Sequence, residues 1–178
     1  MDCNQQVFLR QYPAVVFFVR HLACFRGLKA AWDRVTDHIP FWAWTTDGHL
    51  KLATIAWCNV FGTDNEAIHW KKTPAGPHAE QARQDFRARL LSRTGRTPEQ
   101  WSRYHKDMLN FRNTYVAHYA DTAYTDPVPN FDPALEVAYA YDGWVRALTQ
   151  PAIWEQPPLS SVYEQWRAWA HSVVARDC

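Results

Sequence analysis

The chain has 178 residues, of which 47% are hydrophobic and 21% are charged, and its formal net charge is +1. These values exclude an intrinsically disordered chain, because there is enough apolar side chain to form a core. The length predicts one domain over residues 1–178, with a core bundle at roughly 13–150 and a C-terminal helix at roughly 160–178.

The first third of the chain predicts two helices. Pro13 suits a first helical turn, and apolar residues then recur on one face toward Trp32. The stretch from Asp37 to Gly48 contains a proline and an Asp-Gly pair, so it predicts a loop. A second helix is expected from Leu50 to Phe61, ended by Gly62. Its expected buried residues are Leu52, Ile55, Ala56 and either Cys58 or Val60.

The rest of the chain predicts four more helices separated by Pro- and Gly-bearing connections. The expected helices run from His78 to Arg93, from Thr97 to about Ala120, from Asp132 to Thr149, and from Ser160 or Ser161 toward the C-terminus. No strand-like alternation and no hairpin turn is visible. The expected fold class is therefore all-α, an antiparallel helical bundle of about six helices.

The segment from Arg112 to His118, on the predicted fourth helix, has plausible chemistry. His118 follows Tyr104, Phe111 and Tyr115 at helical spacing. One interpretation is therefore that His118 packs on the apolar face of the helix and that a neighbour satisfies its polar end. Arg112 would lie ~120° around an ideal helix from His118 and ~9 Å along its axis. A joint site therefore requires a distorted helix, or the same segment of a second subunit.

The string from Phe111 to Asp121, Phe-Arg-Asn-Thr-Tyr-Val-Ala-His-Tyr-Ala-Asp, resembles the HEPN superfamily, and most of all its abortive-infection AbiU-type branch. Members of that superfamily carry an Arg, four to six residues and a His on a late helix of a helical bundle. The bare spacing is common by chance, so the resemblance depends on Asn113, the flanking residues and the all-α setting. The upstream region from Trp57 to Trp70 also resembles the AbiU-type branch.

The resemblance implies a HEPN-like, metal-independent endoribonuclease with Arg112, His118 and Asn113 as its catalytic residues. A neutral imidazole can accept the proton of a ribose 2′-OH, and a guanidinium can hold the phosphate. It further implies a toxin or antiviral (abortive-infection) effector that acts as a homodimer and has a cognate antitoxin or inhibitor protein. In some members a partner nucleotidyltransferase modifies a tyrosine two residues after the His. This chain has Ala120 there, so that regulation is not expected.

Charge is unevenly placed along the chain. Nine basic and three acidic residues lie between His69 and Lys106, whereas six acidic residues and one basic residue lie between Asp121 and Glu155. The basic block predicts either a solvated helix face or contacts to RNA phosphates. The residues expected to bind RNA are Lys71, Lys72, Arg83, Arg87 and Tyr119, and Trp70 beside the lysines could stack on a base.

Cysteine and histidine are dispersed along the chain. Four Cys and eight His form no CxxC, no HExxH and no other ligand cluster, so no metal and no cofactor is expected. The longest apolar run, Ala14 to Val19, is too short to span a bilayer, and the N-terminus lacks the pattern of a secretory leader. The expected location is cytoplasmic.

Two alternatives to the nuclease remain open on the sequence alone. One is a catalytically silent HEPN-like module that binds RNA or a nucleotide. The other is a protein-interaction domain whose surface is rich in tryptophan, because ten Trp require a large core, a partner surface, or both.

Overall fold

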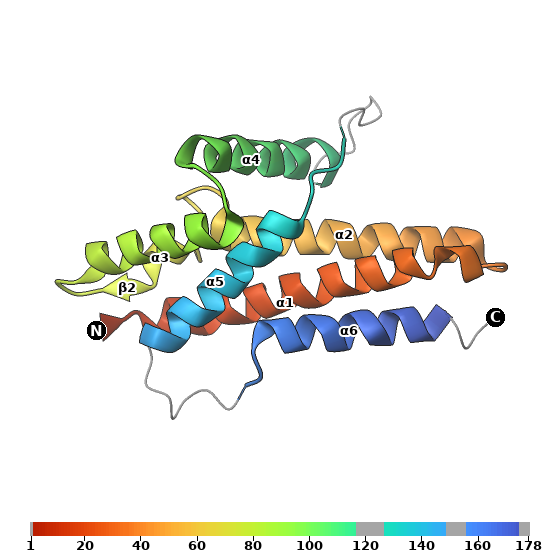
Figure 1. The fold of residues 1–178 in the computed structure, drawn as a ribbon, viewed down its shortest axis with the longest axis horizontal. Coiled ribbons are helices and arrows are strands. Elements are labelled where there is room, and N and C mark those ends of the chain that lie inside the picture. The colour runs from red at the N-terminus through yellow and green to blue at the C-terminus, as the bar shows by residue number, and fades with distance from the viewer. Residues whose placement is uncertain (1, 117–126, 149–155, 175–178) are drawn as a thin grey trace.

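The computed structural model describes residues 2–116, 127–148 and 156–174, and the prediction of an all-α bundle is confirmed there (Figure 1). The helices are α1 (Gln5–Ala30), α2 (Ile39–Phe61), α3 (Ala79–Thr94), α4 (Pro98–Phe111), α5 (Asp132–Leu148) and α6 (Leu159–Val174). Short helical turns are η1 (Trp32–Arg34), η2 (Trp70–Lys72) and the π-helix η3 (Arg112–Val116). The two-residue strands β1 (Asp2–Cys3) and β2 (Pro74–Ala75) pair antiparallel.

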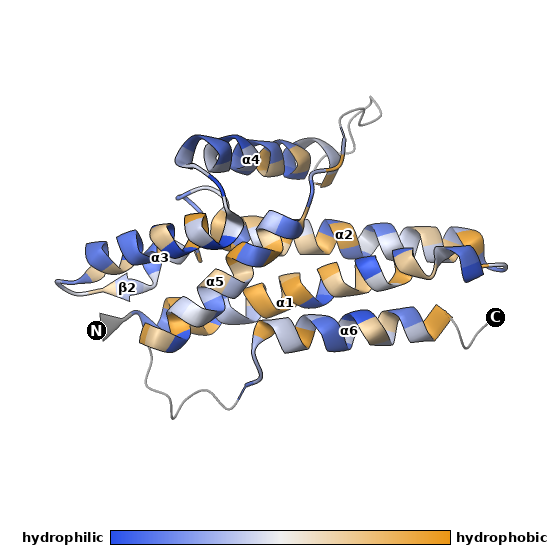
Figure 2. Ribbon diagram, in the orientation of Figure 1, coloured by the Kyte–Doolittle hydropathy of each residue, from blue (hydrophilic) through white to orange (hydrophobic). Residues whose placement is uncertain are grey.

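Helix α1 is the central helix of the bundle. It packs against α2, which runs in the opposite direction, and against α6, while α5 crosses it and packs on α3 (Figure 1). Helix α4 lies apart from this layer and is largely hydrophilic, in contrast to the hydrophobic stretches of α1 and α5 (Figure 2). The bulkiest fully buried side chains are Trp57, Trp144, Tyr141, Phe18, Phe86 and Phe111. Among the described residues, no helix has both the length and the apolar character needed to cross a bilayer.

A glycine permits the close contact between α1 and α6. A Cβ added at Gly27 would lie 2.5 Å from the backbone oxygen of Arg167 and 2.8 Å from the Cβ of Ala170. Both distances are shorter than van der Waals contact, so only a residue without a side chain fits here.

Helix α2 differs from its prediction at both its start and its buried face. It begins at Ile39, so the loop predicted from Asp37 to Gly48 is wrong. Pro40 lies in the first turn, where proline is tolerated, and Gly48 is accommodated within the helix. Leu52 and Ile55 were expected to be buried but are each 41% exposed.

Helix α4 begins as expected and ends earlier than expected. Thr97 and Gln100 form a reciprocal capping box at its N-terminus, with Pro98 in the first turn. The regular helix ends at Phe111 and passes into the π-helix η3, whereas an α-helix to about Ala120 was predicted. His118, Tyr119 and Ala120 lie outside the described residues.

Candidate functional site

One face of α4 is turned toward the connection between α2 and α3. Trp101, His105 and Arg112 recur at spacings of four and seven, which places them on the same side of a helix. They lie opposite residues of the 62–72 loop, which follows the end of α2. We call this region the α4–loop junction, defined by Trp101, His105 and Arg112 on the helix and by Asp64, Glu66 and His69 on the loop.

Arg112 is held in place by two other segments of the chain. Its Nη2 donates to Glu66 Oε1 at 2.9 Å, and both side chains are about one-quarter exposed. The guanidinium also approaches the thiol of Cys58 on α2. Burial raises the pKa of Cys58 to about 12, although the charge of Arg112 acts in the opposite direction. Cys58 is therefore a neutral thiol at physiological pH, and among the described residues Glu66 is the one that neutralises Arg112.

The π-helix η3 is anchored to α2 through Tyr115. The Tyr115 hydroxyl donates to Asp47, which also forms an ion pair of 2.8 Å with Lys51. The Lys51 ammonium lies 4.9 Å from the centroid of the Tyr115 ring. Burial, together with the carboxylate of Asp47, raises the pKa of Tyr115 to about 12, so its hydroxyl stays protonated. Asn113 on the same turn is exposed.

The helical distortion that a joint Arg–His site requires therefore exists at the start of the motif. π-Helical turns are rare and are often found at functional sites. The structure places Arg112 and Asn113 at this turn, and His118 lies beyond the part of the chain that is described. The geometry between Arg112 and His118 stays a prediction.

The two histidines of the α4–loop junction have structural hydrogen bonds. His105 Nε2 lies 2.8 Å from the carbonyl oxygen of Phe61 and 3.1 Å from that of Gly62, so Nε2 carries a proton and closes the end of α2. His69 Nδ1 accepts from the backbone N–H of Lys71, and its Nε2 lies 3.6 Å from Asp64. Burial lowers the pKa of His69 to about 4, so this imidazole is neutral at physiological pH.

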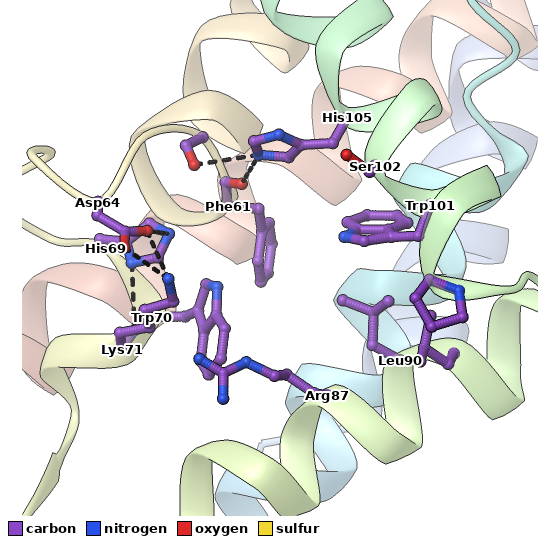
Figure 3. Close-up of a pocket in the computed structure, with 13 residues that line it drawn as sticks. Phe61, Asp64, His69, Trp70, Lys71, Arg87, Leu90, Trp101, Ser102 and His105 are labelled. Carbon is purple, nitrogen blue, oxygen red and sulfur yellow. Dashed lines mark hydrogen bonds and ion pairs between the residues drawn. The ribbon is translucent and has the colours of Figure 1, made fainter. Parts of the chain in front are cut away.

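A cavity of about 300 Å³ lies in the α4–loop junction, between the loop, α3 and α4. Figure 3 shows the rings of Phe61, Trp70 and Trp101 around this space, with Arg87 extending along Trp70. Trp70 is only 7% exposed, and its ring centroid is 4.6 Å from that of Phe86. Its ring is therefore mainly part of the core, which leaves little of it for stacking on a base.

The basic residues predicted to bind RNA gather beside this cavity. Arg83 Nε donates to the carbonyl of Lys71 at 2.9 Å, which ties α3 to η2. The cations are partnered within the chain: Lys71 pairs with Asp64, Lys72 donates to the carbonyl of Glu66, and Arg83 and Arg87 both pair with Glu80. Glu66 thus connects this cluster to Arg112, through its carbonyl on one side and its carboxylate on the other.

No family model, curated protein or solved structure matches this chain. Within the described residues, no group of three or more His, Cys, Asp or Glu is arranged to hold a metal ion. Sequence reasoning did not find Glu66 or Cys58 as partners of Arg112. Both lie in the stretch from Trp57 to Trp70, whose similarity to the AbiU-type branch gives no information on contacts.

Proposed function

We propose that the protein is a HEPN-like endoribonuclease of the cytoplasm that cleaves RNA without a metal ion, acting as a toxin or antiviral effector. One observation carries the proposal: the helix leaves α-helical geometry at Arg112, where the guanidinium is fixed by Glu66 and Cys58. The two stretches that resemble the AbiU-type branch are far apart in sequence. They contact each other at this arginine.

The proposed chemistry assigns one role to each residue of the motif. Arg112 holds the scissile phosphate and offsets the charge that develops on its oxygens. His118 accepts the proton of the ribose 2′-OH, whose oxygen attacks the phosphorus. The 5′-oxygen of the next nucleotide leaves and takes a proton from water, and a 2′,3′-cyclic phosphate remains. Asn113, exposed on the π-helix, orients the ribose. The basic cluster around Lys71 and Arg87 contacts the phosphates of the RNA backbone.

The ion pair with Glu66 favours a second candidate, an RNA-binding module without catalysis. An arginine that is already paired with a carboxylate must exchange that partner before it can hold a phosphate. If the exchange does not occur on RNA, Arg112 acts only as a structural link between α4 and the 62–72 loop. Binding would then depend on the basic cluster alone.

Cleavage of a labelled single-stranded RNA in EDTA tests the proposal. Arg112→Ala and His118→Ala should each lower the cleavage rate by at least about 100-fold, the usual effect of losing a group that stabilises transition-state charge or a positioned general base. Arg112→Lys should also be impaired, because an ammonium cannot make the bidentate contact. The product should carry a 2′,3′-cyclic phosphate.

Two matched variants control for charge and folding. Arg34→Ala removes an exposed arginine outside the basic block, and His78→Ala removes an exposed histidine. Both should cleave RNA at the wild-type rate, and all variants should keep the helical far-UV circular dichroism spectrum. Wild-type cleavage by folded His118→Ala would refute the nuclease, and retained RNA binding would then support the second candidate.

A further inference from the structure

The outer face of α2 is a stripe of large apolar side chains. Trp44 is 81% exposed and Phe41 is 61% exposed, and Leu52 and Ile55 are each 41% exposed. With Gly48 they follow one another at spacings of three, four, four and three residues, which is one face of a helix. We call these five residues the α2 stripe. None of them belongs to the α4–loop junction.

The α2 stripe is symmetric about its glycine. Trp44 and Leu52 lie four residues to either side of Gly48, and Phe41 and Ile55 lie seven residues to either side. A Cβ added at Gly48 would meet nothing within 4 Å, so the middle of the stripe is open. In a two-fold contact centred on Gly48, each position of the stripe meets the position equally far on the other side of Gly48, so large apolar residues would face large apolar residues.

We propose that the α2 stripe is the interface of a homodimer in which α2 of one copy packs antiparallel on α2 of a second copy, with the two Gly48 residues at the crossing point. Phe41 would then lie across from Ile55 of the second copy, and Trp44 across from Leu52. The absence of a side chain at position 48 lets the two backbones approach each other closely. The aromatic and aliphatic residues would pack on either side of the crossing.

The size of the stripe suits a reversible dimer. Side-chain areas weighted by the exposed fractions give about 450 Å² per copy, which is a large patch for a monomer's surface. Two copies would bury about 900 Å², which exceeds a typical crystal contact and is somewhat below a standard stable interface. Ile39, which is 51% exposed at the start of α2, can extend the contact. A dissociation constant of about 1–100 µM is expected.

The charges beside the stripe are compatible with this arrangement. Asp47 and Lys51 flank the α2 stripe on the side where Tyr115 packs. In an antiparallel pair centred on Gly48, Lys51 of each copy would lie beside Asp47 of the other, so opposite charges meet. A two-fold axis through this centre also places both π-helices η3 on the same side of the paired helices.

Sedimentation velocity over a protein concentration range of about 5–200 µM tests the interface without RNA. Wild-type protein should dimerise, and Gly48→Gln should raise the dissociation constant at least about tenfold, because a side chain would block the crossing. Gly143→Gln is the matched control: it changes another helical glycine, on α5, whose added Cβ would also meet nothing within 4 Å. It should dimerise like wild type.

Cysteine cross-linking tests the register. Gly48→Cys should form an intersubunit disulfide under mild oxidation, because a residue at the two-fold axis meets its own copy, and Gly143→Cys should give no more cross-linked dimer than wild type. A wild-type monomer throughout the concentration range would overturn the proposal, as would wild-type dimerisation of Gly48→Gln. Either outcome leaves the nuclease proposal standing, because the assay contains no RNA.

Discussion

Replacing Glu66 by glutamine should strengthen RNA binding. The change keeps the size of the side chain and an oxygen that can accept from Arg112, but it removes the negative charge 2.9 Å from the guanidinium. In the proposed complex a phosphate takes the place of Glu66 beside Arg112. The carboxylate then stands close to a second anion, and removing it relieves that repulsion.

The magnitude follows from the geometry and the exposure. Two unit charges about 6 Å apart repel by about 0.7 kcal/mol in water and by more at a partly buried site. Glu66 is 27% exposed, so about 1 kcal/mol is a reasonable value, which corresponds to about fivefold in affinity. The gain should shrink as salt rises, because the repulsion is screened. Loss of the ion pair should cost at most about 1 kcal/mol of stability.

Fluorescence anisotropy with a labelled single-stranded RNA at low and moderate salt measures the effect. Glu164→Gln is the control, because it makes the same charge change next to Arg167 on the distant helix α6. Adding Arg112→Ala to Glu66→Gln should abolish the gain. If Glu66→Gln binds RNA no better than Glu164→Gln, then no phosphate takes the place of Glu66, and the proposed role of Arg112 is wrong.

Two further predictions concern stability. Gly27→Ala should lower the free energy of unfolding by about 1–3 kcal/mol, because its Cβ would overlap the backbone of α6, whereas Gly143→Ala should raise it by up to about 1 kcal/mol; equal melting temperatures for the two variants would contradict the close contact. Burial lowers the pKa of His69 to about 4, below its value in the unfolded chain. The contribution of neutral His69 to the free energy of unfolding is therefore complete above about pH 6.5 and is lost as the pH falls toward 4. Urea titrations should show a loss on the order of 2–3 kcal/mol from this group, and His69→Gln should reduce it; a pH-independent unfolding free energy would exclude a buried neutral His69.

The helices of the second half were predictable because their ends carry local signals. Thr97 and Pro98 mark the start of α4, and Gly95 in the left-handed conformation ends α3. The start of α2 was not predictable in the same way. Pro40 and the Asp-Gly pair are typical of turns, but packing of α2 against α1 outweighs the cost of one helical glycine. Leu52 and Ile55 of the α2 stripe were wrongly predicted to be buried, because apolar spacing does not tell which face of the helix is covered.

The candidate site was predictable only in part. Its local component, Arg112 and Asn113 in one short string, was visible in the sequence. Its tertiary component was not, because Glu66 and Cys58 reach Arg112 from segments at least 46 residues away. No periodicity connects such positions, since the contact is made by the folding of the 62–72 loop onto α4. The same holds for Tyr115 and Asp47, which are 68 residues apart.

The two proposals meet at the contact between η3 and α2. On an ideal helix Arg112 and His118 point in different directions, so a joint site requires a distorted helix or a second subunit. The described part of the chain has the distortion, at Arg112–Val116. The α2 stripe provides a surface for a second copy, and pairing there would place the two η3 turns on the same side of the paired α2 helices. The Gly48→Gln variant separates these two routes, because position 48 is outside the α4–loop junction and a Cβ added there would meet nothing within 4 Å in the monomer. Cleavage by this variant as a monomer would mean that the distortion within one chain suffices. If the variant does not cleave RNA as a monomer but does so at concentrations that force dimerisation, then each site is completed by the partner copy.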